Sequence, residues 1–174
     1  MAAPEHRNDG PWQIAVIGAG ISEAGLDPQA VDIGRLVAES GNILLCGGLG
    51  GIMEAAARGA KEAGGTTIGI VPGAERFQAN SSIDYEIVTN LGHLRNFLII
   101  HSADGVVALP GSYGTQTEIS IAMKLGKPLV AIGRHWHFIP EVHCYVNPGV
   151  AFSTLLKQLG KRPVTDEKQF AELY

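Results

Sequence analysis

The chain has 174 residues, of which 45% are hydrophobic and 17% are charged, with a formal net charge of -4 at pH 7. This length suits one well-buried domain, and the acidic balance gives no general attraction for a nucleic acid, so nucleic acid is not an expected partner. We expect a cytoplasmic protein with no membrane partner, because no run approaches the roughly 18 apolar residues that span a bilayer and the N-terminus lacks a signal-peptide pattern. The two cysteines, Cys46 and Cys144, are expected to be reduced thiols.

Short apolar runs rich in Val and Ile alternate with longer amphipathic stretches, which is typical of βαβ units. Strands are predicted at residues 12–17, 43–46, 67–71, 85–88, 105–109 and 128–132, and helices at 28–40, 51–63, 91–102, 115–125 and 150–160. The strands show little alternation, as expected of parallel strands covered on both faces. The chain is therefore predicted to form a single three-layer, Rossmann-like α/β domain with a mostly parallel sheet.

This nucleotide-binding domain is expected to span residues 12–174, after a mobile tail at 1–11. Small residues recur at helical spacing in the predicted helix 51–63, so this helix is expected to lie close against the sheet. The segment 166–174 is weakly helical and is expected to be peripheral. Parallel sheets bind ligands at the carboxyl ends of their strands, where three glycine-rich turns should meet.

The first of these turns, GAGISEAG at residues 18–25, contains the candidate ligand-binding residues Gly18 and Gly20. Their backbone N–H groups could approach a phosphate, but Glu23 stands where the dinucleotide fingerprint has its third glycine. A tight strand-to-helix turn explains the same residues.

The second turn, CGGLGGIMEAA at residues 46–56, leaves a strand and enters a helix whose first N–H groups are free to bind an anion. No Lys-Ser or Lys-Thr pair follows, so this turn is not a nucleoside-triphosphate loop. Close packing of the helix on the sheet is the alternative interpretation. The candidate ligand contacts here are Gly47, Gly48, Gly50, Gly51 and Met53.

The third turn, PGSYGTQTE at residues 110–118, leads into another predicted helix that begins near Thr115. A nucleophile elbow is excluded, because that motif needs glycine two residues before the serine and Pro110 stands there. Glu118 has two interpretations: it completes a capping box with Thr115, or its carboxylate faces a sugar and stabilises positive charge at the anomeric carbon. The candidate phosphate contacts are Pro110, Gly111, Ser112, Tyr113, Gly114 and Thr115.

Taken together, GHLRNFLIIHSADGVVALPGSYGTQTEISIA and the upstream CGGLGGIMEAAARGAKEAGG resemble the LOG family of cytokinin-activating nucleoside monophosphate phosphoribohydrolases, which are often mislabelled as lysine decarboxylases. They also resemble a shorter sister branch that includes the molybdenum cofactor carrier proteins. The LOG signature P-G-G-x-G-T-x-x-E is matched except at Ser112, which replaces a glycine. Arg95 matches the arginine of the family's Arg-Lys pair, and Asn96 replaces the lysine.

The resemblance implies that Glu118 and Arg95 are catalytic, that the glycine-rich turns hold a 5'-phosphate, and that the protein forms a homodimer through helices near 91–125, with a higher oligomer as the alternative. The implied reaction is hydrolysis of the N-glycosidic bond of a nucleoside 5'-monophosphate, without a cofactor. The sister branch implies the alternative, a carrier that binds the molybdenum cofactor through its pterin phosphate without turnover. A pyridoxal-dependent decarboxylase is excluded, because no lysine follows a strand into the expected crevice.

The segment RHWHFIPEVHC at residues 134–144 gathers His135, His137, His143 and Cys144 at the same sheet edge. A metal site is one interpretation. An ordinary polar loop, with Trp136 or Phe138 beside the ligand, is favoured, and no metal ligand is assigned.

Overall fold

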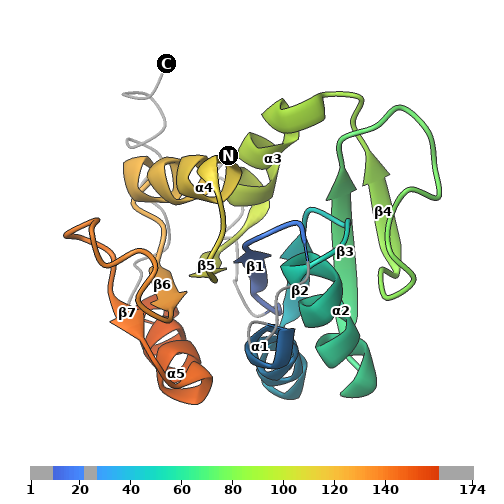
Figure 1. Cartoon of the computed structure of the whole chain (residues 1–174). Helices are drawn as coiled ribbons and strands as arrows, with labels where there is room; N and C mark the ends of the chain where they lie inside the picture. Colours follow the sequence, from blue (N-terminus) through green and yellow to red (C-terminus); the bar gives the residue numbers. More distant parts are fainter. Residues whose placement is uncertain (1–9, 22–26, 161–174) are drawn as a thin grey trace, which may run out of the picture.

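The computed structural model describes residues 10–21 and 27–160. Within them, seven parallel strands form one sheet in the order β4-β3-β2-β1-β5-β6-β7 (Figure 1). The strands are β1 (Gln13–Ile17), β2 (Ile43–Cys46), β3 (Thr66–Val71), β4 (Tyr85–Val88), β5 (Gly105–Ala108), β6 (Leu129–Ile132) and β7 (Cys144–Tyr145). The helices are α1 (Asp27–Glu39), α2 (Ile52–Glu62), η1 (Gly92–Leu94), α3 (Arg95–Ser102), α4 (Tyr113–Lys124) and α5 (Pro148–Leu159).

The predicted fold class is confirmed: the chain forms a three-layer α/β domain around an all-parallel sheet. The six predicted strands are present, each within one residue of its predicted ends. The prediction missed β7, because two residues after a polar loop give no apolar run to detect. Residues 1–9, 22–26 and 161–174 lie outside the described residues, and with them lie Glu23, most of the expected tail and the weak helix at 166–174.

Two separate apolar clusters hold the layers together, one on each face of the sheet. Helices α1, α2 and α5 pack on one face, where Ile14 and Val16 of β1 point. Helices α3 and α4 cover the other face (Figure 1). There, residues of both helices and Trp136 pack against Ala15 and Ile17 of the same strand. Successive residues of β1 therefore serve opposite cores, which explains its continuous apolar sequence.

Helix α2 packs against α1 at backbone distance. A Cβ built on Gly59 would lie 2.1 Å from the carbonyl oxygen of Val31, and one built on Gly34 would lie 1.9 Å from that of Ala56. The small residues of α2 were expected to face the sheet, and Ile52 and Ala56 are buried in that core. Gly59 instead permits the contact with α1, because only glycine fits between two helix backbones this close.

The chain reverses its direction of strand addition between β1 and β5, which are neighbours in the sheet. Ligands of doubly wound sheets bind at such a switch point, outside the carboxyl ends of the strands. The turns after β1, β2 and β5 meet there at Ala19. Its N–H donates to the carbonyl oxygen of Pro110 at 3.0 Å, and its own carbonyl oxygen accepts from the N–H of Ile52 at 3.0 Å.

Candidate functional site

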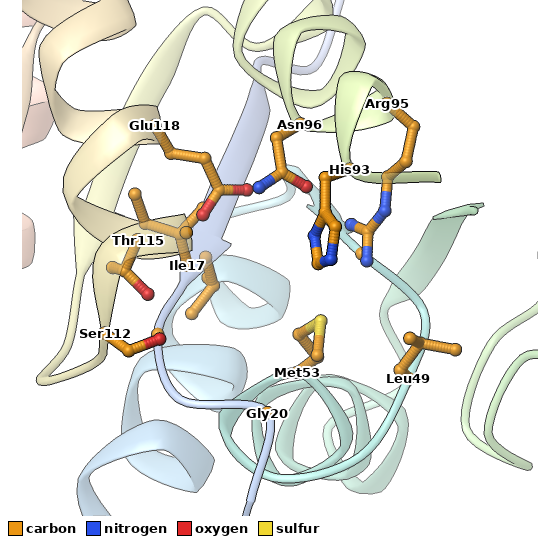
Figure 2. A pocket seen from close by; sticks show the side chains of 14 residues that line it. Ile17, Gly20, Leu49, Met53, His93, Arg95, Asn96, Ser112, Thr115 and Glu118 are labelled. Atoms are coloured by element: carbon orange, nitrogen blue, oxygen red, sulfur yellow. The ribbon is translucent and has the colours of Figure 1, made fainter. Parts of the chain in front are cut away.

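A cavity of about 200 Å³ lies at this switch point. Figure 2 shows Ser112, Thr115 and Glu118 of the α4 segment facing His93, Arg95 and Asn96 of the η1–α3 segment, with Gly20, Leu49 and Met53 below. The volume is below the roughly 300–1,000 Å³ of pockets that enclose a whole drug-sized ligand. The cavity therefore has room for part of a nucleotide. Its lining comprises Val16, Ile17, Gly18, Gly20, Gly47, Leu49, Met53, His93, Arg95, Asn96, Ser112, Gly114, Thr115 and Glu118.

Helix α4 begins at Tyr113, two residues before the predicted start, with Ser112 as its N-cap. No side chain caps this terminus, so the first-turn N–H groups have no side-chain acceptor. The capping box interpretation is wrong, because Thr115 lies inside the helix and its hydroxyl packs against Gly111. The N-terminus of α4 thus remains a site where a phosphate would find free donors and the positive end of the helix dipole.

Glu118 lies in the second turn of α4, and only 6% of the residue is exposed. Its carboxylate points into the cavity (Figure 2). Burial raises the pKa of this carboxyl group to about 7, and the positive charge of Arg95 opposes the shift. A carboxyl group with a pKa near neutrality, facing a cavity, is placed to stabilise positive charge or to transfer a proton.

Arg95 is the first residue of α3 and is also buried, with 7% of the residue exposed. Its guanidinium lies over Gly47, where a Cβ would come within 2.0 Å of Nη1. Burial lowers the pKa of Arg95, while the nearby Glu118 and Cys46 raise it. The buried Nε of Arg95 has no hydrogen-bond partner within the described residues, and an unsatisfied buried donor marks a place for a ligand or an ordered water.

The turn before α2 is held by close packing and by hydrogen bonds to its carbonyl oxygens. Gly51 has a positive φ of 64°, and a Cβ there would lie 2.4 Å from the carbonyl oxygen of Ala19. The carbonyl oxygens of Gly48 and Leu49 accept from Nδ2 of Asn80 at 3.2 and 2.7 Å. Gly51 therefore serves packing, and Asn80, which the sequence prediction missed, positions the turn.

The predicted ligand contacts divide into three groups by position. Gly18, Gly20, Gly47, Met53, Ser112, Gly114 and Thr115 line the cavity together with Arg95 and Glu118. Gly48, Gly50, Gly51 and Pro110 are absent from its lining, and Gly111 and Tyr113 line a neighbouring cavity. The prediction missed Val16, Ile17 and Leu49, whose apolar side chains carry no chemical signal, and Asn96, which could have been found as the neighbour of Arg95. His93, which the sequence allowed to approach a substrate without assigning it, also lines the cavity.

The histidine-rich segment 134–144 forms the loop between β6 and β7. Nε1 of Trp136 donates to the carbonyl oxygen of Leu109 at 2.9 Å, which ties this loop to the turn before α4. The His135 ring packs edge-on against the Trp136 ring at 4.5 Å, and Nδ1 of His137 lies 2.6 Å from the carbonyl oxygen of Arg134. Over residues 10–21 and 27–160 there is no group of three or more His, Cys, Asp or Glu side chains placed to hold a metal ion.

The fold and the site define the class: this is a doubly wound α/β protein with a ligand cavity at the carboxyl edge of its sheet, walled by glycine turns and two buried ionisable side chains. The SLOG cluster4 family model matches residues 11–153. The chain belongs to this LOG-like family, as its motifs predicted. Among the described helices, none is long and apolar enough to cross a membrane.

Two similar relatives cover most of the chain. An uncharacterized protein of Archaeoglobus fulgidus is 44% identical over 120 residues, which cover 69% of this chain and 79% of the relative. The cytokinin riboside 5'-monophosphate phosphoribohydrolase of Mycobacterium tuberculosis is 32% identical over 140 residues, 74% of each chain.

Among solved structures, the molybdenum cofactor carrier protein of Chlamydomonas reinhardtii superposes with a TM-score of 0.78 at 34% identity. The match covers 88% of this chain and 99% of that one. Relatives of both the hydrolase and the carrier type therefore have similar sequence identity to this chain, while the match to the carrier covers more of both chains.

Proposed function

We propose that this protein binds a nucleoside 5'-monophosphate and hydrolyses its N-glycosidic bond, releasing the free base and ribose 5-phosphate. The observation that carries this proposal is Glu118, a buried carboxyl group that faces the cavity with a pKa raised to about 7. A carrier has no developing positive charge that such a carboxylate would have to stabilise. An enzyme that must stabilise a developing cation does gain from it.

The phosphate binds at the N-terminus of α4, because the first turn of this helix lines the cavity at Gly114 and Thr115 and its N-cap Ser112 presents a hydroxyl there. The N-cap of α2, Gly51, also has no side-chain hydrogen bond but does not line the cavity. In the turn before α2, Arg95 and Met53 lie over Gly47. With the phosphate on the first turn of α4, the sugar extends along the cavity toward Glu118, one turn further into the helix.

In the reaction, the bond between C1' and the base nitrogen breaks and its electron pair leaves with the base, which takes up a proton. The sugar becomes an oxocarbenium-like cation, which the Glu118 carboxylate stabilises, and water adds to C1' and loses a proton. Arg95 keeps Glu118 more acidic than burial alone would, since its charge lowers the pKa of that carboxyl group. Arg95 also offers donors to the substrate.

Incubation with AMP and with a cytokinin riboside monophosphate, followed by chromatography for free base and ribose 5-phosphate, tests the proposal. We expect release of the base from at least one substrate, and none from the corresponding nucleoside, which lacks the phosphate. Release at background level from every monophosphate would overturn the hydrolase proposal.

The second candidate function is binding of the molybdenum cofactor without turnover, which the structural match to a carrier protein over 88% of this chain supports. The α4 terminus would take the pterin phosphate. The metal would receive no thiolate from Cys46, because that residue is fully buried and burial raises its pKa to about 11. Tight binding of the cofactor with no release of base from any nucleotide is the outcome that favours the carrier.

The protein is further proposed to form a homodimer through the η1–α3 segment. This segment exposes Leu94, Phe97 and Leu98, the preceding residue Leu91 is also exposed, and 74% of Leu94 is accessible. Contiguous exposed apolar side chains mark interaction surfaces. A second copy is the occupant that the family resemblance implies.

Leu94→Glu is therefore expected to convert dimers to monomers, because it places a charge in the apolar contact. Light scattering after size-exclusion chromatography measures the change. Val146→Glu is the matched control, because Val146 is 72% exposed and directly follows the edge strand β7. This variant should leave the mass unchanged. If wild type and Leu94→Glu have the same mass, the dimer surface lies elsewhere.

Asn80→Ala should weaken ligand binding, because Asn80 supports the turn that carries Leu49 into the cavity. We expect a rise in KM of several-fold and a loss of stability of about 1 kcal/mol. Asn147→Ala removes the N-cap of α5 and should cost a similar amount of stability without changing KM. Equal KM values for the two variants would contradict a positioning role for Asn80.

A further inference from the structure

A second cavity, of about 210 Å³, lies on the other side of the turn before α4. Gly111, Ser112 and Tyr113 form one wall, and His135, Trp136 and Phe138 of the β6–β7 loop form another. Ser112 lines both cavities. The open N-terminus of α4, at which the phosphate is proposed to bind, therefore separates two spaces of similar size.

The two cavities differ in chemistry. The first presents glycine backbone, Arg95 and Glu118, as suits a phosphorylated sugar. The second is walled by aromatic rings, of which Tyr113 is 87% exposed and Phe138 is 55% exposed. Exposed rings beside a cavity provide flat surfaces on which a planar ring can stack.

The second wall is held in place by contacts that do not involve a ligand. Trp136 is 2% exposed, its Nε1 bonds to the carbonyl oxygen of Leu109, and its ring lies 6.0 Å from that of Phe138. His135 packs edge-on against the same ring. The wall formed by His135, Trp136 and Phe138 is thus preformed, and binding there would not have to order it.

The residue that joins the cavities departs from the family signature. Ser112 stands where the signature has glycine, and its hydroxyl makes no hydrogen bond to any described residue. A hydroxyl at this position can donate to a phosphate oxygen from the wall shared by both spaces. Because Ser112 lines both cavities, its hydroxyl can also serve a phosphate group that continues from the first cavity into the second.

We infer that the second cavity binds a ring-bearing group attached to the distal side of the phosphate, so that the ligand is a nucleotide extended at its 5'-phosphate by a diphosphate link to a second planar ring. This inference rests on the proposed function for the placement of the phosphate and deepens it by naming a substrate class. The sugar beside Glu118 remains the one whose glycosidic bond is broken. The second ring stacks between Tyr113 and Phe138.

Calorimetric titration of the full-length Glu118→Gln protein, in which the ligand is not consumed, tests this inference with AMP, ADP and diadenosine 5',5'-diphosphate. We expect the dinucleotide to bind roughly 10-fold to 100-fold more tightly than AMP or ADP, because one more base stacks on aromatic side chains. Phe138→Ala should reduce dinucleotide affinity toward that of AMP and leave AMP binding unchanged, and Tyr113→Ala should reduce dinucleotide affinity by a larger factor than AMP affinity. Tyr85→Ala, at an exposed tyrosine of the edge strand β4, is the matched control and should change neither affinity.

Dinucleotide affinity no higher than that of ADP would overturn the inference, as would equal losses for AMP and the dinucleotide in the two variants. The proposed hydrolysis fails separately, when wild-type protein releases no base from any nucleotide. Tight, Tyr113-dependent binding of the dinucleotide without release of base would support the second cavity while overturning the hydrolase.

Discussion

Glu118→Gln is expected to reduce kcat/KM by at least about 100-fold and, at the same time, to stabilise the fold above pH 7. The loss of activity follows because an amide carries no charge to stabilise the cation at C1', and removal of one such electrostatic contribution typically costs 100-fold to 1,000-fold. The gain in stability follows because the carboxyl group is buried and its pKa is raised from 4.5 to about 7.

The sign of the stability effect comes from proton binding. Between pH 4.5 and 7 the folded protein holds a proton on Glu118 that the unfolded chain has released, so the free energy of unfolding falls as pH rises through this window. The shift corresponds to about 3 kcal/mol at pH 8 and under about 1 kcal/mol at pH 5. Urea denaturation should therefore show a stability gain for Glu118→Gln at pH 8 that is largely absent at pH 5.

Glu62→Gln is the matched control, since Glu62 is exposed at the end of α2 and should change neither activity nor stability. Full hydrolytic activity in Glu118→Gln would contradict charge stabilisation. Equal stability of wild type and variant at pH 8 would show that the Glu118 carboxylate is better solvated than its burial implies.

Arg95→Met is expected to lower kcat/KM by roughly 100-fold and to move the midpoint of the pH–activity profile upward. In wild type, kcat/KM should rise with pH around a midpoint near 7, because the ionised form of Glu118 is the active one. Arg95 lowers the pKa of Glu118, so its removal leaves the carboxyl group protonated to higher pH. Methionine keeps most of the volume of the side chain, which limits the packing defect.

Initial rates between pH 5.5 and 9 measure the shift. Arg58→Met is the control, because Arg58 is an exposed arginine of α2 and should leave the profile unchanged. A loss of activity without any movement of the midpoint would assign Arg95 to substrate binding alone. A midpoint that moved downward would contradict the coupling to Glu118.

Much of the fold could be predicted from the sequence because buried parallel strands have continuous apolar sequences. The run 105–109 is an example: residues 105–108 form β5 and are buried throughout. The short strand β7 could not be predicted, since a two-residue strand after a polar loop has no such pattern. The predicted start of α4 at Thr115 was also wrong by two residues, because Thr115 and Glu118 match a capping box that the structure does not form.

For the site, the motif predicted residues by type, but their surroundings depend on the tertiary structure. Arg95 and Glu118 could be picked out by resemblance, while the burial of both on facing helices, which sets their pKa values, arises only when α3 and α4 pack on the same sheet face. Asn80 is the clearest omission. It lies 31 residues from Leu49 in sequence, and nothing near it marks it as the support of that turn.

Ala19 couples the positions of the three glycine-rich turns. Its two backbone hydrogen bonds join the turn after β1 to Pro110, in the turn before α4, and to Ile52, at the start of α2. A displacement of any one of these turns therefore moves the other two through Ala19. A methyl group added at Gly51 would press on Ala19 and through it on the turn before α4, although Gly51 is outside the cavity lining. Small shifts of catalytic groups lower the reaction rate substantially. Glycines such as Gly51, which do not line the cavity, should therefore tolerate few substitutions.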